Sequence, residues 1–186
     1  MVRVFIAVDI DDPLILGRLE RIRDSISSTG VPMKPVETEN MHITIRFIGE
    51  VPESRVDDIV REALEPIDIG EFKTKLVGLG GFPNPYRPRV IWIGVTEGSD
   101  ELIGINRIVE RGVRRAGFKP ERAQFHPHVT IARVKGTRNL EKLVKVMISY
   151  RDTEFGEMMV SSVRLKKSIL TRKGPIYETI YERRLG

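Results

Sequence analysis

The sequence lacks cysteine entirely, and this absence excludes disulfide scaffolds, thiolate metal sites and cysteine nucleophiles. It also lacks any stretch close to the roughly 18 consecutive apolar residues that a membrane-spanning helix requires. The apolar run at the N-terminus reaches Asp9 too soon to form the core of a signal peptide. We therefore expect a soluble cytoplasmic protein with no membrane partner.

The excess of positive charge is small. The chain carries 31 Lys and Arg against 26 Asp and Glu, a formal net charge of +5. This excess favours a polyanionic partner, but both signs are interspersed along the chain, as on an ordinary solvated surface. Charge therefore does not identify a partner by itself. The 40% of hydrophobic residues is enough to build the core of one moderately large domain.

An internal repeat organises the chain. The segment RVFIAVD at Arg3 returns as RVIWIGVT at Arg89, an offset of 86 residues. Each copy reads as a buried strand, and each is followed by a segment with helical spacing of apolar residues, at 11–28 and 99–117. A polar-faced strand and a second helix come next, with the helices at roughly 54–64 and 139–150. Alternating strand-like runs complete each half.

This order predicts an α+β fold made of two pseudo-symmetric lobes. Each lobe is expected to be a mainly antiparallel sheet with helices on the outside, and the two lobes should enclose a central cleft. No linker separates them, so we expect residues 1–186 to form one bilobal domain. Its intertwined lobes should cover roughly 1–88 and 89–186.

The second strand of each half carries the same motif, a histidine followed two residues later by threonine. The motifs are HITI, beginning at His42, and HVTI, beginning at His128, again 86 residues apart. Strict alternation puts His42, Thr44 and Arg46 on one strand face, and Phe47 on the apolar face. A lone histidine on a strand is more often structural than catalytic. Two at matched repeat positions favour a shared cleft that presents two imidazoles and two hydroxyls.

Two imidazoles that face one point suit the cleavage of a phosphodiester. One group must take a proton from the nucleophile while the other gives a proton to the leaving oxygen, and histidine can do both near neutral pH. Thr44 and Thr130 can donate hydrogen bonds to phosphoryl oxygens. Arg46 lies on the polar face of its strand. Simple alternation puts Arg133 on the opposite face from His128, so Arg133 reaches a phosphate only if its strand twists, bulges or ends.

Two other readings of these residues stay open. His42, His126 and His128 together could ligate zinc, but the chain has no HExxH pattern and no acidic ligand at a characteristic spacing, so we expect no metal. A non-catalytic module that binds RNA ends is the alternative function. The candidates for base stacking are Phe47, Tyr86, Trp92 and Phe125, although the strand patterns around Phe47 and Trp92 favour a core position for both.

The segments RVFIAVDI, HITIRFIGE, FPNPYRPRVIWIGV and FHPHVTIARV resemble the two-histidine phosphoesterases. The resemblance is strongest to the 2'-5' RNA ligase-like group, the RNA 2',3'-cyclic phosphodiesterases, and it covers nearly the whole chain. It implies a two-lobed fold and an RNA-processing hydrolase that uses neither metal nor cofactor. The implied reaction opens a 2',3'-cyclic phosphate at an RNA end and leaves a 2'-phosphomonoester.

The same resemblance implies roles for the motif residues. His42 would be the proton donor and His128 the proton acceptor, with Thr44 and Thr130 on the phosphate. The symmetric pattern alone does not distinguish donor from acceptor. Some members of the group also join RNA ends through a 2'-5' linkage. The implied partner is RNA with 2',3'-cyclic phosphate ends, and tRNA fragments are one candidate.

Overall fold

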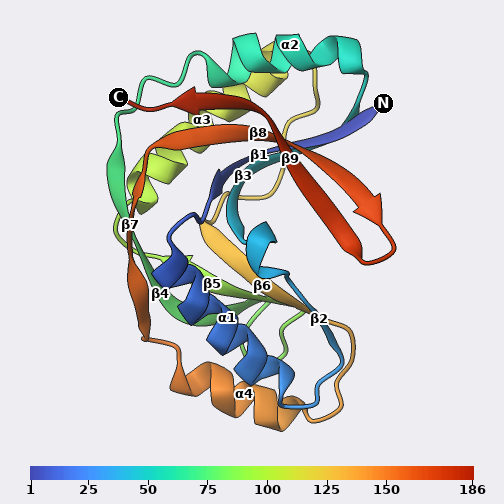
Figure 1. Cartoon of the computed structure of the whole chain (residues 1–186), viewed down its shortest axis with the longest axis vertical. Coiled ribbons are helices and arrows are strands. Elements are labelled where there is room, and N and C mark those ends of the chain that lie inside the picture. The colour runs from blue at the N-terminus through green and yellow to red at the C-terminus, as the bar shows by residue number, and fades with distance from the viewer.

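The computed structural model describes all residues from 1 to 186, and its strands form one curled antiparallel sheet flanked by helices (Figure 1). The strands follow the order β7-β4-β5-β6-β3-β1-β8-β9, and β2 pairs with β6 beside this path. The α+β prediction is confirmed. The strands are β1 (Val2–Asp9), β2 (Met33–Pro35), β3 (His42–Val51), β4 (Phe72–Phe82), β5 (Val90–Val95), β6 (His128–Val134), β7 (Glu154–Val160), β8 (Ser162–Thr171) and β9 (Gly174–Arg184).

Helices form at the four places where the sequence predicts them. Asp12 caps the first, because its carboxylate accepts hydrogen bonds from the backbone N–H groups of Leu14 and Ile15. None of the helices is long and apolar enough to cross a membrane. The helical elements are α1 (Pro13–Ser27), η1 (Thr38–Asn40), η2 (Glu53–Arg55), α2 (Val56–Ile59) with its π-helical continuation η3 (Val60–Leu64), α3 (Ser99–Arg115) and α4 (Leu140–Ser149).

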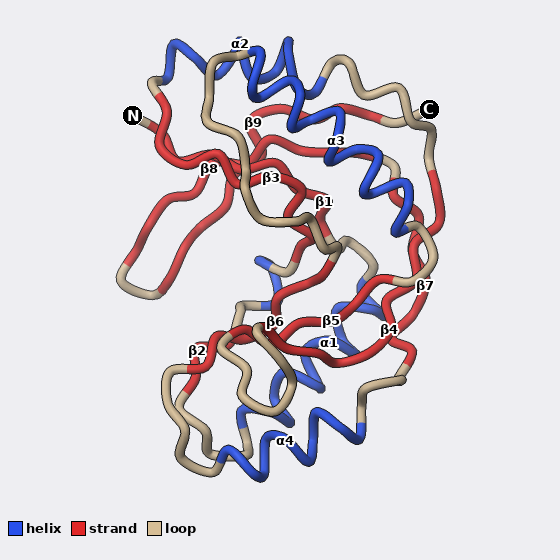
Figure 2. Tube along the Cα trace, turned by 180° about the vertical axis from the view of Figure 1, so that it is seen from behind, coloured by secondary structure: helices blue, strands red, loops and turns tan.

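The two halves of the chain exchange their first helices. Helix α1, from the first half, packs against β7 and α4 of the second half, whereas α3, from the second half, packs against β3 of the first. Figures 1 and 2 show α1 beside α4 and α3 beside α2 at opposite ends of the molecule. The buried apolar side chains form one continuous cluster that draws on both halves. Neither half therefore encloses a core of its own.

The two half-sheets join where β3 meets β6. One registered pair, Ile43 opposite Val129, connects these antiparallel strands. The two residues are 86 positions apart, which is the repeat offset, so they are equivalent positions of the two halves. On the outer side of this junction, β1 lies beside β3 in one half-sheet, and β5 lies beside β6 in the other. The two predicted sheets are thus continuous, and the strands that carry the histidine motifs are neighbours at the centre.

Candidate active site

A β-bulge interrupts each motif strand at the same repeat position. In β3, Thr44 and Arg46 face consecutive residues of β1, which leaves Ile45 as the extra residue. In β6, Thr130 and Ala132 face consecutive residues of β5, which leaves Ile131 extra. The extra residues are again 86 positions apart. A bulge of this kind reverses the alternation of side chains for the rest of the strand.

The carbonyl groups of the two bulged residues find hydrogen-bond donors outside the paired strands. The side-chain amide of Asn106 on α3 donates to the carbonyl of Ile45 at 2.9 Å. The backbone N–H of Val36 donates to the carbonyl of Ile131, also at 2.9 Å. Because an unpaired buried carbonyl is costly, these partners help to hold both bulges in place.

The bulges decide which side chains reach the cleft. Beyond them, Phe47 and Arg133 turn to the face that carries the histidines, and both line the cleft. The expected core position of Phe47 is wrong, since its side chain is 44% exposed. Simple alternation placed Arg133 on the face opposite His128. The bulge in β6 reverses the alternation, so Arg133 and His128 line the same cleft.

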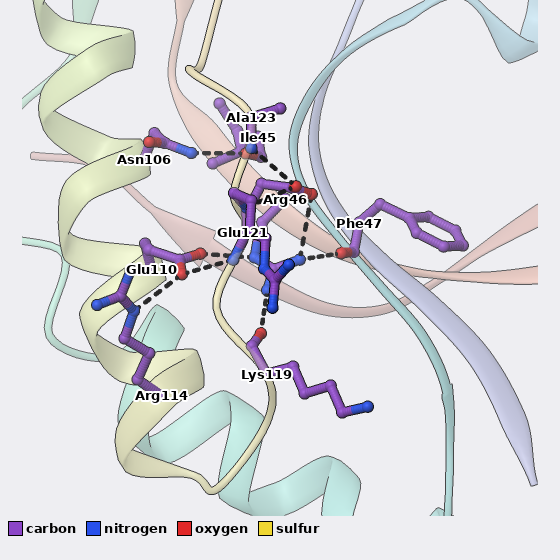
Figure 3. Close-up of polar contacts among 10 residues, drawn as sticks. Ile45, Arg46, Phe47, Asn106, Glu110, Arg114, Lys119, Glu121 and Ala123 are labelled. Carbon is purple, nitrogen blue, oxygen red and sulfur yellow. Dashed lines mark hydrogen bonds and ion pairs between the residues drawn. The ribbon is translucent and has the colours of Figure 1, made fainter.

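Arg46 does not lie in the cleft, and its predicted place beside the phosphate is wrong. The bulge turns its side chain away from the histidines and into a buried ion pair with Glu110 of α3, at 2.6 Å. Its guanidinium also donates to the backbone carbonyls of Phe47 and Lys119 (Figure 3). Arg46 is only 7% exposed, and these contacts hold its guanidinium away from the cleft lining.

The cleft has a volume of about 640 Å³ and contains both histidine motifs. His42, Thr44, His128 and Thr130 all contribute to its lining, together with Arg133. The structure thus brings together five of the six predicted site residues. The volume is within the usual range for small-molecule sites.

The two imidazoles are held in the same way. Nδ1 of His42 lies 2.7 Å from the carbonyl oxygen of Asn40, and Nδ1 of His128 lies 2.5 Å from that of His126. Because a carbonyl only accepts, each Nδ1 carries the proton and donates it. Each Nε2 is therefore the atom available for chemistry. Nε2 of His42 lies 2.9 Å from the hydroxyl of Thr44.

Aromatic rings fix the two imidazoles from different sides. Tyr177 and Phe5 pack against His42, with ring centroids 5.5 Å and 5.1 Å away. Phe82 packs edge-on against His128 at 5.0 Å. The rings restrict rotation about the side-chain bonds, so that both Nε2 atoms keep their direction.

Burial lowers the pKa of both histidines below the ordinary value. For His42, the hydrogen bond to Asn40 and the negative charge of Asp9 act in the opposite direction, while Lys166 adds to the lowering. For His128, the hydrogen bond to the His126 carbonyl raises the pKa, and the positive charge of Arg133 lowers it further. Both rings are therefore mainly neutral at pH 7 in the free protein.

A carboxylate lies behind only one of the two histidines. Asp9 pairs with His42 across β1 and β3, and its carboxylate receives hydrogen bonds from Lys166 and Arg164, both at 2.7 Å. Burial raises the pKa of Asp9, but these two cations outweigh burial and lower it overall. Asp9 therefore stays charged, and it stabilises a proton on His42 more than one on His128.

Several residues line the cleft that the sequence motifs do not indicate. Arg3, Lys34 and Lys173 add positive charge to the lining, against the single carboxylate of Glu37. Tyr177 also lines the cleft, where burial raises its pKa. These residues come from β1, β2 and the β8–β9 hairpin, far from the motifs in sequence. No short pattern could have identified them.

His126 lies outside the cleft lining. Its ring packs against Trp92 and Phe82, with centroids 5.0 Å and 5.5 Å away. No group of three or more His, Cys, Asp or Glu side chains is placed to hold a metal ion. Of the four aromatic candidates for base stacking, only Phe47 lines the cleft; Tyr86, Trp92 and Phe125 do not.

Comparison with known proteins places this geometry in a family. The family described as LigT like Phosphoesterase matches the chain twice, at residues 10–92 and 93–177. The RNA 2',3'-cyclic phosphodiesterase of Aeropyrum pernix is 56% identical over 168 residues, which cover 90% of this chain and 95% of that protein. The protein of the same name from Methanothermobacter thermautotrophicus is 40% identical and covers 95% of each chain.

Solved structures share the fold. The crystal structure of TT0787 of Thermus thermophilus superposes with a TM-score of 0.79 at 25% identity, covering 98% of this chain and 97% of that one. The structure of E. coli LigT complexed with 3'-AMP gives a TM-score of 0.78 at 23% identity, covering 99% of this chain and 98% of that one. The two-lobed architecture is therefore common to all three.

The displaced Arg46 generates a stability prediction. We expect Arg46→Met to lower the free energy of unfolding by about 2 kcal/mol, because it leaves the partly buried Glu110 carboxylate without its closest partner. The matched control is Arg114→Met. Arg114 pairs with the same carboxylate at 3.1 Å but is 57% exposed, so its loss should cost less than about 1 kcal/mol. Urea unfolding measures both, and equal losses would contradict the buried pair.

Proposed function

Since the chain belongs to the LigT-like phosphoesterase family, we propose that it hydrolyses 2',3'-cyclic phosphates at RNA ends to 2'-phosphomonoesters. Two histidines would supply general acid-base catalysis, without a metal. The observation that carries the proposal is the common cleft, in which both motif histidines and both motif threonines meet under a cationic lining. RNA with cyclic phosphate ends, tRNA fragments among them, is the proposed substrate.

The hydrogen bonds to Nδ1 suit both catalytic roles. A ring whose Nδ1–H donates to a carbonyl has a free electron pair on Nε2 when it is neutral, and an Nε2–H when it is protonated. Each imidazole can thus accept or donate a proton at Nε2 without turning. The backbone carbonyls of Asn40 and His126 keep this orientation in either state.

We assign His42 as proton donor and His128 as proton acceptor. Asp9 favours the protonated form of His42, whereas the charge of Arg133 favours the neutral form of His128. Water would lose a proton to His128 as its oxygen bonds to phosphorus. The bond from phosphorus to O3' would break, and O3' would take the proton from His42. The phosphate then remains on O2'.

The remaining polar groups of the cleft suit a phosphate with one negative charge. The hydroxyls of Thr44 and Thr130 would donate to the non-bridging oxygens, where charge accumulates as water adds. Arg133 would offset that charge through its guanidinium, which is well suited to phosphate. The same arrangement serves 2'-5' ligation when the 5'-hydroxyl of a second RNA replaces water as the nucleophile.

The direct test is hydrolysis of a short RNA with a 2',3'-cyclic phosphate, in the presence of EDTA. We expect His42→Ala and His128→Ala each to lower kcat by about 10² to 10⁴-fold, because each removes one proton-transfer group. His126→Ala is the matched control, and it should keep most of the activity because His126 lies outside the cleft lining. Thermal melting shows whether each variant is folded.

Three results would contradict the proposal. Equal turnover by the wild type and a folded His42 or His128 variant would remove the two-histidine mechanism. Loss of wild-type turnover in EDTA would indicate a metal. Binding of the cyclic end without turnover would favour the alternative, a non-catalytic module that binds RNA ends.

The lowered histidine pKa values predict an acidic optimum for kcat/KM, which reports the free enzyme. The acceptor must be neutral and the donor protonated, and both pKa values lie below about 6.5. We therefore expect kcat/KM to peak below pH 6.5 and to fall as the pH rises past it, because His42 loses its proton. Initial rates at low substrate from pH 4.5 to 8.5 measure this profile. A peak above pH 7.5 would contradict the account.

A further inference from the structure

The hairpin of β8 and β9 extends beyond the rest of the sheet. Strand β1 pairs with β8 only as far as Ser168, and β9 has no strand partner except β8. Residues 169–176 therefore form a two-stranded ribbon without a third strand, and Figures 1 and 2 show it running out from the body. We refer to residues 169–176 as the ribbon tip.

The ribbon is attached beside His42 at its tip as well as at its base. The side-chain amide of Asn40 donates to the carbonyl of Pro175 at 2.9 Å. The ring of Tyr177 packs against both His42 and Phe5. Through Leu170, Lys173 and other residues, the ribbon forms one wall of the cleft. Whatever occupies the cleft at His42 therefore lies alongside the ribbon.

The ribbon is strongly basic. The stretch from 163 to 177 contains Arg164, Lys166, Lys167, Arg172 and Lys173, and no acidic residue. Arg164 and Lys166 both pair with Asp9, and Arg164 pairs with Asp11 and Glu182 as well. In contrast, Arg172 and Lys173 at the turn are exposed and form none of the ion pairs of the molecule. Lys34 faces the cleft from β2 with its charge likewise unpaired, so exposed cations stand on two sides of the cleft.

Apolar side chains accompany these cations. Leu170 is 71% exposed and Ile176 is 53% exposed, on the two strands of the tip. Unpaired cations along a groove follow the phosphate backbone of single-stranded nucleic acid, and Leu170 and Ile176 add apolar surface beside these cations. A protein partner matched to apolar side chains alone would not account for the unpaired charge.

We propose that the ribbon tip binds the RNA chain on the 5' side of the terminal phosphate. This inference rests on the proposed function. A 2',3'-cyclic phosphate is the last group of its RNA, so the remaining nucleotides must leave the cleft in one direction. The tip is held beside His42 through Asn40 and carries two unpaired cations at its turn, and it therefore contacts the phosphates of the preceding nucleotides. The enzyme then prefers RNA chains to isolated cyclic nucleotides.

The test compares two RNAs with the same 3' sequence and a 2',3'-cyclic phosphate, one of two nucleotides and one of about ten. The readout is the ratio of kcat/KM for the long RNA to kcat/KM for the short one, so that any effect on the cleft common to both substrates cancels. The variant is Arg172→Gln with Lys173→Gln. The matched control is Lys142→Gln with Lys145→Gln, which removes two exposed cations from α4, a helix that contributes no residue to the cleft lining.

We expect the wild type and the α4 control to favour the long RNA by about tenfold, and the tip variant to lose most of this preference. A wild-type ratio near one, or equal ratios in the tip variant and the wild type, would overturn the proposal. The same would follow if the α4 control lost as much as the tip variant.

A measurement of RNA binding tests the role of the tip even if the proposed function fails, because binding does not require turnover. If the wild type turns over neither RNA, the proposed function fails, and the tip is then tested by fluorescence anisotropy with the ten-nucleotide RNA ending in a 2'-phosphate. Loss of two phosphate contacts should reduce the slope of log affinity against log salt by about 1.4 in the tip variant. An unchanged slope would overturn the role of the tip.

Discussion

The junction between β3 and β6 is the constraint on which the site depends. A single registered pair joins the two half-sheets, and it joins equivalent positions of the repeat. The residue before Ile43 is His42, and the residue before Val129 is His128. Both histidines therefore reach the same cleft from neighbouring strands. The exchange of α1 and α3 between the halves supports this junction, because each half relies on the other for its core. Movement of one half against the other would cost packing throughout the molecule.

The backbone of the site is symmetric, but its surroundings are not. Each histidine donates a hydrogen bond from Nδ1 to the backbone carbonyl two residues before it. Each strand has a bulge directly after its threonine. However, the second residue after the bulged isoleucine is Phe47 in one half and Arg133 in the other. A carboxylate lies behind His42 alone. A reaction that needs a donor on one side and an acceptor on the other can use such a difference, which a fully symmetric site would lack.

Much of this arrangement could be predicted from the sequence. The repeat offset of 86 predicted two equivalent halves around a common cleft, and the period-two pattern predicted that His42 and Thr44 share a face. The bulges could not be predicted, because Ile45 and Ile131 are apolar and suit either register. Simple alternation consequently put Arg46 in the cleft and Phe47 in the core. One signal was available: at the repeat offset, Arg46 corresponds to Ala132, so Arg46 and Arg133 are not equivalent positions.

In the proposed mechanism, the two bulged strands present both histidines and Arg133, but not Arg46, to one phosphate. The most direct measurement is ¹⁵N NMR of protein labelled in its histidine and arginine side chains, titrated with a short RNA that ends in a 2'-phosphate. The account predicts that Nε2 of His42, Nε2 of His128 and Nε of Arg133 shift together with one dissociation constant, while Nε of Arg46 stays constant. Saturation that leaves His128 and Arg133 unchanged, or that shifts Arg46, would contradict it.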